Sequence, residues 1–234
     1  MKKLISKLKS VEGGRVLDVA TRDGAFIVKL KEGLKNYEEI IGIDNNEEII
    51  NKNNENNTEL NIKYLFMDAT DMDFEDNSFD IVCMSNTLHH LPDKNKVLNE
   101  MKRVLKPGGI FIINELLDEN QSPAQMTHVK LHELEGVMNS LLGTYHSKTL
   151  KKQETIDLIK DLGVNIEEIF EDYETDREIQ KGLANRVLNL SKKVAKLKDY
   201  SQYEEIVKLA EDIKKNFDSF GVERSTQLVI MGRI

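Results

Sequence analysis

Short apolar runs alternate with amphipathic stretches over the first half of the chain. Runs rich in Val, Ile and Leu that lie between turn residues are typical of strands buried on both faces. They predict strands at residues 15–20, 39–44, 62–67, 79–84 and 110–114. Helical spacing predicts helices after residues 24 and 44 and at residues 94–105, where Pro107-Gly108-Gly109 predicts a stop and a turn. This alternation predicts right-handed crossovers and a parallel α/β sheet.

The second half of the chain has a mostly helical pattern. Helices are predicted at residues 123–142 and 151–162, and strands at residues 165–170 and 227–231. Between these strands, apolar residues recur at spacings of four and three in two series: Leu183, Val187, Leu190, Val194 and Leu197, then Ile206, Leu209, Ile213 and Phe217. This spacing predicts a helical hairpin with one apolar seam, which packs within the chain or forms the interface of a homodimer.

The length of 234 residues favours one domain over residues 1–234. We expect residues 118–150 to form a helical cover after the fifth strand. Residues 176–220 are expected to form a hairpin insertion before the last strand. The segment before the first strand is short, so these two additions are the available lids over a site.

Composition and charge narrow the class of protein. Hydrophobic residues make up 39% of the chain, and no apolar run approaches the length that spans a bilayer. The lysines of residues 1–10 interleave with apolar residues, which predicts an amphipathic helix and not a secretion signal. The lone Cys83 lies between apolar residues, as expected for a core thiol in a reducing cytoplasm. The net charge of −8 argues against a nucleic-acid partner and favours a small-molecule substrate.

Several of the predicted strands end on polar residues. Asp18 lies in the first strand, Asp44 ends the second, Asp68 follows the third and Ser85-Asn86 follows the fourth. The carboxyl ends of parallel strands meet at one edge of a sheet, and α/β proteins bind ligands outside that edge. An acid beside the turn at Gly24 needs a polar partner, which is a ligand or the start of the following helix. We favour a ligand.

Residues 16–24, Val-Leu-Asp-Val-Ala-Thr-Arg-Asp-Gly, resemble the first motif of class I S-adenosylmethionine-dependent methyltransferases, Asp-x-Gly-x-Gly-x-Gly. Residues 86–93 and 98–109 resemble the small-molecule branch that includes ubiquinone and menaquinone methyltransferases, also called methyltransferase type 11. The resemblance covers residues 12–115. It implies a Rossmann-like fold with a seven-stranded, mostly parallel sheet, an antiparallel last strand and a helical insertion. It also implies methyl transfer from S-adenosylmethionine, with S-adenosylhomocysteine as a product.

The resemblance assigns roles to the residues at the strand ends. Asp18 would lie near the methionine ammonium, Asp44 would accept hydrogen bonds from the ribose hydroxyls, and Asp68-Ala69 would hold adenine. The three acids together with Leu105-Lys106-Pro107-Gly108-Gly109 separate this family from dehydrogenases, which also place an acid after the second strand. The expected cofactor-binding residues are Asp18, Ala20, Arg22, Gly24, Asp44, Asn45, Asp68, Ala69, Ser85 and Asn86.

Two positions depart from the family pattern. Glycine lets the backbone approach a ligand closely because it lacks a β-carbon. Gly24 keeps this property and Ala20 nearly does, but Arg22 does not. The Arg22 side chain either crowds the cofactor or pairs with the methionine carboxylate. Asn45 stands where an apolar residue often packs on adenine.

Histidines are the candidate general bases for an acceptor that must lose a proton, because their pKa lies near neutrality. For His89 and His90, a capping or packing role is favoured. His128, His132 and Glu135 share one helix face and with His146 have the spacing of a metal site. The chain lacks a His-Glu-x-x-His motif, so we predict no metal and a histidine-lined substrate pocket. The catalytic candidates are His146, His128 and His90.

Three functions remain open. The first is methylation of a small molecule. The second is methylation of RNA or protein through the basic residues of the hairpin, Arg186, Lys192, Lys193, Lys196 and Lys198, although such residues usually form a solvated face. The third is a non-catalytic interaction module, suggested by the missing glycines. Against base modification stand the negative charge and the lack of Asp/Asn-Pro-Pro-Tyr or Pro-Cys after the fourth strand. Retention of Asp18, Gly24, Asp44 and Asp68 argues against loss of cofactor binding.

Overall fold

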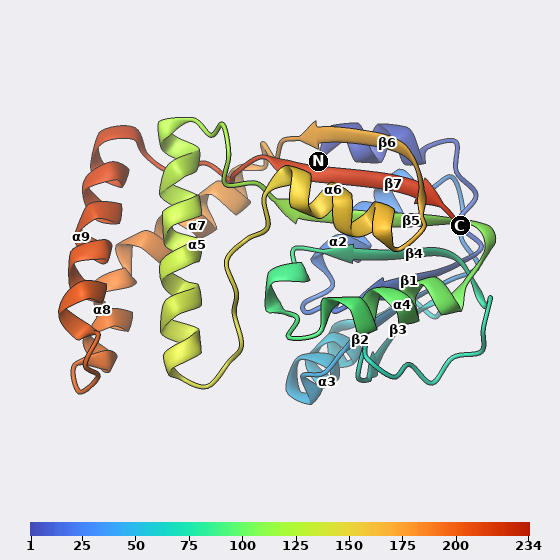
Figure 1. The fold of residues 1–234 in the computed structure, drawn as a ribbon, viewed down its shortest axis with the longest axis horizontal. Coiled ribbons are helices and arrows are strands. Elements are labelled where there is room, and N and C mark those ends of the chain that lie inside the picture. Colours follow the sequence, from blue (N-terminus) through green and yellow to red (C-terminus); the bar gives the residue numbers. More distant parts are fainter. The chain divides into compact units, whose positions relative to one another are not determined.

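The apolar runs form one seven-stranded sheet. Its strands are β1 (Arg15–Val19), β2 (Glu39–Asp44), β3 (Ile62–Phe66), β4 (Phe79–Ser85), β5 (Leu105–Leu116), β6 (Asn165–Asp172) and β7 (Gln227–Arg233). They lie in the order β3-β2-β1-β4-β5-β7-β6, and β1 to β5 are parallel. Figure 1 shows β7 running opposite to β5. The mostly parallel sheet with an antiparallel last strand is therefore confirmed.

The computed structural model describes residues 1–234, which divide into two units. The sheet unit comprises Met1–Glu115, Lys152–Asp172 and Leu228–Ile234. The helical unit comprises Leu116–Lys151 and Tyr173–Gln227, so it contains both segments predicted as additions to the fold. That the two units behave as one domain, and that the additions cover a site, stay predictions.

The predicted helices of the sheet unit are present. They are α1 (Lys2–Leu8), α2 (Ala25–Gly33), α3 (Glu47–Asn56), the 3-10 turn η1 (Leu88–His90), α4 (Lys94–Val104) and α6 (Lys152–Asp161). Side-chain caps explain two of the starts: Asn46 accepts a hydrogen bond from the Ile49 amide at 3.1 Å, and Asp93 accepts one from the Lys96 amide at 2.9 Å. These caps fix the points at which α3 and α4 begin, after the carboxyl ends of β2 and β4.

The amphipathic first helix predicted at residues 1–10 is α1. Its apolar residues Leu4 and Leu8 lie in the same hydrophobic cluster as Val16 of β1 and Leu30 of α2. The Leu4 amide also donates to Asp172 Oδ2 at the end of β6, at 2.8 Å. The helix is thereby docked on the sheet unit.

The predicted turn at Pro107-Gly108-Gly109 is wrong. The helix α4 ends at Val104 as expected, but these residues lie inside the long strand β5. Leu105 pairs with Phe79 and Ile110 pairs with Ile81, so β5 carries extra residues opposite β4 at this point. A β-bulge absorbs the proline and glycines without ending the strand, because extra residues on one strand need no partner.

The helical unit has its own apolar core. It contains α5 (Pro123–Leu141), α7 (Arg177–Leu188), α8 (Leu190–Val194), the 3-10 turn η2 (Ala195–Leu197) and α9 (Tyr203–Phe220). The core gathers the predicted hairpin seam against α5, with Leu131, Leu134 and Met138 facing Val187, Leu190, Val194, Leu197, Ile206 and Ile213. None of the protein's helices combines the length and apolar character that a bilayer-spanning helix needs.

The hairpin differs from the prediction in two details. Its first arm is not one helix: Asn189, at φ −96° and ψ 3°, leaves helical geometry and separates α7 from α8. Leu209, predicted in the seam, is 43% exposed. Apolar periodicity predicts which residues share one face of a helix. It does not predict which residues of that face a neighbouring helix such as α5 covers.

Candidate functional site

The carboxyl ends of β1 to β4 meet at one edge of the sheet unit, as predicted. Parallel pairing sets Asp18 beside both Gly42 and Cys83, and Asp44 beside Phe66. Ser85 pairs with Asn114 of β5. The edge therefore gathers the polar residues that the sequence singled out at the ends of these strands.

The turn after β1 keeps the backbone shape that glycines would give it. Three of its residues have positive φ: Ala20 at 56°, Arg22 at 49° and Gly24 at 74°. A residue with a β-carbon pays about 1 to 3 kcal/mol for this left-handed conformation, so it persists only where other contacts enforce it. The Arg22 amide donates to Asp44 Oδ2 at 2.9 Å, and Asn53 Nδ2 donates to the Arg22 carbonyl at 2.6 Å.

Gly24 is required by the protein itself. A β-carbon built there would lie 2.5 Å from the hydroxyl oxygen of Tyr64. The sequence suggested that this glycine makes room for a ligand, but the side chain that fills the space belongs to β3. Tyr64 was not foreseen, because no local pattern links it to the turn.

Asp18 lies beneath the turn. It is 1% exposed, and Thr21 Oγ1 donates to its Oδ2 at 2.6 Å. The Cys83 thiol, which is buried in the core as predicted, donates to its Oδ1 at 3.6 Å. Burial raises the pKa of Asp18 to about 7, against the opposing effect of these two hydrogen bonds. Asp18 therefore supports the turn through Thr21, and its contact with a methionine ammonium stays a prediction.

Asp44 holds two loops with its two oxygens. Oδ2 accepts from the Arg22 amide and Oδ1 accepts from the Asn46 amide at 3.0 Å. Each carboxylate oxygen has a second lone pair, so two further hydrogen bonds remain available. Asn45, the departure after Asp44, is exposed.

Asp68 starts a turn after β3. The Thr70 amide donates to its Oδ1 at 2.8 Å, and this hydrogen bond lowers the pKa of Asp68. The side chain is exposed and Ala69 is half-buried. The lowered pKa keeps this carboxylate ionised at neutral pH.

Asn86 carries a buried acceptor. Its backbone is left-handed, with φ 52°, and its main-chain N–H donates to the main-chain carbonyl of Asn114 at 2.8 Å. Its side-chain nitrogen donates to Ser85 Oγ at 3.1 Å, but its Oδ1 is buried and has no hydrogen-bond partner in the protein. A buried unsatisfied acceptor costs about 1 to 3 kcal/mol, so this atom is suited to a donor from a ligand.

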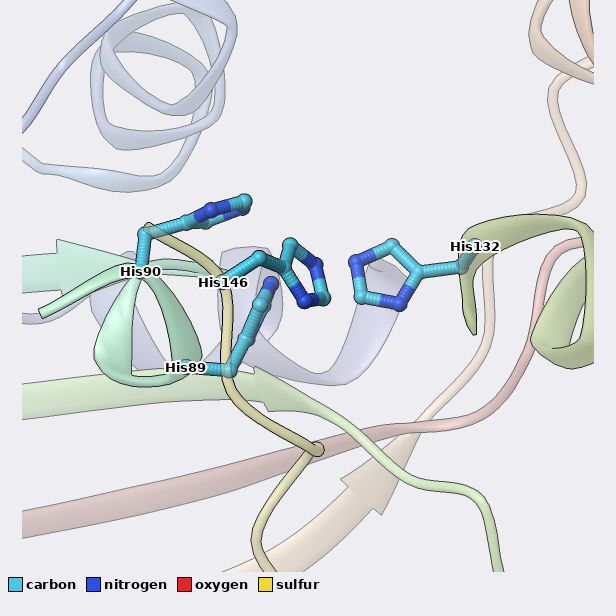
Figure 2. Close-up of side chains that lie close together, drawn as sticks. All are labelled: His89, His90, His132 and His146. Carbon is cyan, nitrogen blue, oxygen red and sulfur yellow. The ribbon is translucent and has the colours of Figure 1, made fainter. Parts of the chain in front are cut away.

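His89 is fixed by a carboxylate that the sequence did not reveal. His89 Nδ1 lies 3.2 Å from Glu115 Oε1, and both side chains are buried. Glu115 Oε2 also accepts from the Leu88 amide at 2.9 Å, which ties the end of β5 to η1. The favoured structural role of His89 is consistent with these contacts. The ring of His90 lies beside it, with centroids 4.2 Å apart (Figure 2).

The predicted shared face of His128, His132 and Glu135 is divided in the structure. His128 is buried and its Nδ1 accepts from the Ser225 amide at 3.0 Å. Burial lowers its pKa to about 3, and nearby arginines add to this effect. The neutral imidazole is a weak base at neutral pH, which argues against His128 as the catalytic base.

Glu135 also contacts other residues of the helical unit. It forms ion pairs with Arg186 and, at 2.9 Å, with Lys193. These pairs lower its pKa although its burial acts in the opposite direction. Two of the basic hairpin residues are therefore occupied inside the helical unit. His132 instead faces His146, with ring centroids 5.1 Å apart (Figure 2).

Comparison with known proteins decides the family. A family model described as a methyltransferase domain matches residues 10–171. This chain belongs to the S-adenosylmethionine-dependent methyltransferases. The resemblance inferred from the sequence motifs is therefore confirmed, and the family is one of enzymes that use S-adenosylmethionine.

Relatives of this methyltransferase agree with that assignment. The demethylmenaquinone methyltransferase of Staphylococcus aureus (strain MRSA252) is 34% identical over 115 residues, which are 49% of this chain and 48% of the relative. The chain thus spans about half the length of the curated relatives it matches. A proposed methyltransferase from Bacillus halodurans C-125 has a TM-score of 0.65 and 19% identity, covering 98% of this chain and 96% of that one.

A second similar structure holds S-adenosylhomocysteine. Phosphoethanolamine N-methyltransferase 2 of Haemonchus contortus, solved with phosphomonomethylethanolamine and S-adenosylhomocysteine, has a TM-score of 0.57 and 19% identity. It covers 99% of this chain, and this chain covers 52% of it. The likeness shows the Rossmann-like fold of the family.

The residues at the sheet edge fit S-adenosylmethionine. The unsatisfied Asn86 Oδ1 needs a hydrogen-bond donor, and the ammonium of the methionine part is one. Asp44 keeps one lone pair on each oxygen, which is the number of acceptors that two hydroxyls need. The turn from Ala20 to Gly24 has positive φ at three residues, the conformation that glycine favours, and the Arg22 side chain in it is exposed.

Proposed function

We propose that this methyltransferase methylates a small-molecule acceptor. The observation that carries this proposal is the pairing of Arg186 and Lys193 with Glu135, which offsets one of the positive charges on the hairpin face that an RNA would need. The net charge of −8 also disfavours a polyanionic acceptor. The relative from Staphylococcus aureus acts, by its name, on demethylmenaquinone, a small molecule.

The proposed cofactor contacts follow the strand ends. Asp44 binds the ribose hydroxyls, and Asp68 with Ala69 binds adenine. The turn containing Ala20, Arg22 and Gly24 lies along the methionine part, and Asn45 lines the adenine side. Ser85 and Asn86 meet the ammonium. The free lone pairs of Asp44 and the unsatisfied oxygen of Asn86 support these assignments.

When bound, S-adenosylmethionine supplies a methyl group on a sulfonium, which an acceptor takes by in-line displacement. The residues of this chain then have to orient the acceptor and exclude water. His90 and His146 remain the proposed bases for an acceptor that must lose a proton. His128 is left out, because burial holds its imidazole neutral.

A labelling experiment tests the acceptor class. The full chain is incubated with methyl-labelled S-adenosylmethionine and, in separate reactions, with a low-molecular-weight metabolite extract, total RNA and total protein. Label should enter the metabolite pool only. Label confined to RNA or protein would refute the small-molecule proposal while leaving the methyltransferase activity intact.

A titration tests the cofactor contacts. Replacing Asp44 with alanine removes acceptors for two hydroxyls and the anchor of the Arg22 amide, so calorimetry should show at least about tenfold weaker S-adenosylmethionine binding. Asp73→Ala, at an exposed acid of the same sheet unit, is the matched control. Equal affinity of the Asp44 variant and the unmodified protein would remove Asp44 from the ribose site.

Dimerisation through the hairpin stays a prediction. The apolar seam that suggested it is buried against α5 within one chain, so a dimer would have to use the exposed apolar residues of the same helices, such as Leu209. Analytical ultracentrifugation of the full chain measures the mass directly. A single monomer peak would end this proposal.

A further inference from the structure

Two histidines of the helical unit face each other. His132 lies on α5 and His146 lies in the segment that follows this helix. Figure 2 shows their rings opposed, with centroids 5.1 Å apart and planes tilted by 54°. Each ring offers a nitrogen, and these nitrogens lie within 4.8 Å of each other. Both side chains are half-buried, so the pair is partly shielded from water yet still accessible.

The close approach of the two rings depends on a glycine. Gly136 lies one helical turn after His132, and residues at this spacing share a helix face. A β-carbon at position 136 would overlap the ring of His146. The segment after α5 can therefore return along the helix and place His146 next to His132 only because position 136 has no side chain. This arrangement brings the pair together by tertiary packing and not by sequence spacing alone.

The chemistry of the pair selects the ligand. Imidazole nitrogens are neutral at physiological pH and favour Zn²⁺, Cu²⁺ and Ni²⁺, whereas Mg²⁺ and Ca²⁺ prefer oxygen ligands. Zinc binds histidine nitrogen at about 2.0 to 2.1 Å, so two ligands on one tetrahedral ion lie roughly 3.4 Å apart. Small side-chain rotations would bring the two rings to that separation. Water would complete the coordination sphere.

We propose that His132 and His146 bind a divalent transition metal ion, with Zn²⁺ as the first probe. The sequence predicted no metal because it lacks a His-Glu-x-x-His motif and because polar residues at helical spacing usually mark a solvated face. In the structure His128 accepts a hydrogen bond from Ser225, and Glu135 pairs with Arg186 and Lys193. His132 instead lies beside His146. His146 is also one of the proposed bases, so the test measures zinc binding directly and does not depend on methyl transfer.

The test uses the full chain, freed of metal with a chelator and titrated with ZnCl₂ by calorimetry. The unmodified protein should bind zinc, and His132→Ala and His146→Ala should each weaken binding by at least about tenfold. The conservative variants His132→Asn and His146→Asn guard against misfolding, and circular dichroism checks each protein. His128→Asn, at the other histidine of α5, which contacts Ser225, is the control and should bind zinc as the unmodified protein does.

Thermal unfolding gives a second readout. Zinc should raise the melting temperature of the unmodified protein and of His128→Asn, because a ligand that binds only the folded state stabilises it. It should not raise the melting temperature of the His132 or His146 variants. The proposal is overturned if zinc does not bind the unmodified protein, if folded His132 and His146 variants bind it equally well, or if folded His128→Asn no longer binds it.

Discussion

Replacing Asp18 with asparagine should flatten the pH dependence of stability in the sheet unit. Asp18 is fully buried, and burial raises the pKa of its carboxyl to about 7 in the folded chain. The corresponding value in an unfolded chain is about 3.9. Between these values the folded state binds a proton that the unfolded state lacks, so the free energy of unfolding falls as pH rises. The full difference corresponds to about 4 kcal/mol, which is retained below about pH 4 and lost once the pH passes 7.

The asparagine variant isolates this effect. Its amide oxygen can still accept the hydrogen bond from Thr21, but it cannot ionise. Urea unfolding of both proteins at about pH 5 and about pH 8 should show that their difference in stability changes by about 2 to 3 kcal/mol, with the variant gaining at the higher pH. Parallel pH profiles for the two proteins would refute the reasoning, since Asp18 would then titrate alike in both states.

The same pair of proteins tests the predicted contact between Asp18 and the methionine ammonium. An ionised carboxylate attracts this ammonium and a protonated one does not. If the contact exists, the affinity for S-adenosylmethionine should rise as the pH passes 7 in the unmodified protein but not in Asp18→Asn. An identical pH profile of affinity would leave Asp18 only its support of the turn through Thr21.

Three further substitutions test the turn and the helical unit. Arg22→Gly removes a β-carbon from a left-handed residue, so the free energy of unfolding should rise by about 0.5 to 1 kcal/mol in thermal unfolding. Asp23→Gly, at a residue whose φ is not positive, is the control and should lower it. A lower free energy of unfolding in both variants would show that Arg22 is not strained. Gly24→Ala should lower the free energy of unfolding by at least about 1 to 2 kcal/mol. Adding Tyr64→Phe should restore part of this loss, because it removes the hydroxyl that the new β-carbon would contact. If the double variant is no more stable than Gly24→Ala, this contact is not the cause. Glu135→Gln weakens the pairs with Arg186 and Lys193 and should cost about 2 kcal/mol in urea unfolding, and an unchanged midpoint would show that these pairs do not stabilise the helical unit.

Local patterns sufficed for the strands and for the ligand edge of the sheet. Buried parallel strands read as apolar runs, and the polar residue that follows each run is at the carboxyl edge by topology alone. Asp44 and Asn86 could therefore be placed without a structure. The extension of β5 through Pro107-Gly108-Gly109 could not, because a bulge depends on how β4 pairs across from it.

Contacts between distant segments account for what the sequence did not reveal. Tyr64 against Gly24 and Glu115 against His89 each join elements that only the assembled sheet brings together. A short-range signal did exist for Thr21, which lies three residues after Asp18 and can reach back to its carboxylate. Helical spacing placed His128 and Glu135 on one face of α5, but it could not show that each contacts a different segment of the chain.

The hydrogen bond from the Arg22 amide to Asp44 has a consequence for how such sites can be found. The donor is a main-chain group, so every residue except proline can supply it at position 22. The loop shape is thus enforced from the neighbouring strand and tolerates the exchange of glycine for a large cation. A search for the glycine pattern would pass over this turn. A search for a loop amide within bonding distance of the acid that ends the second strand would find it.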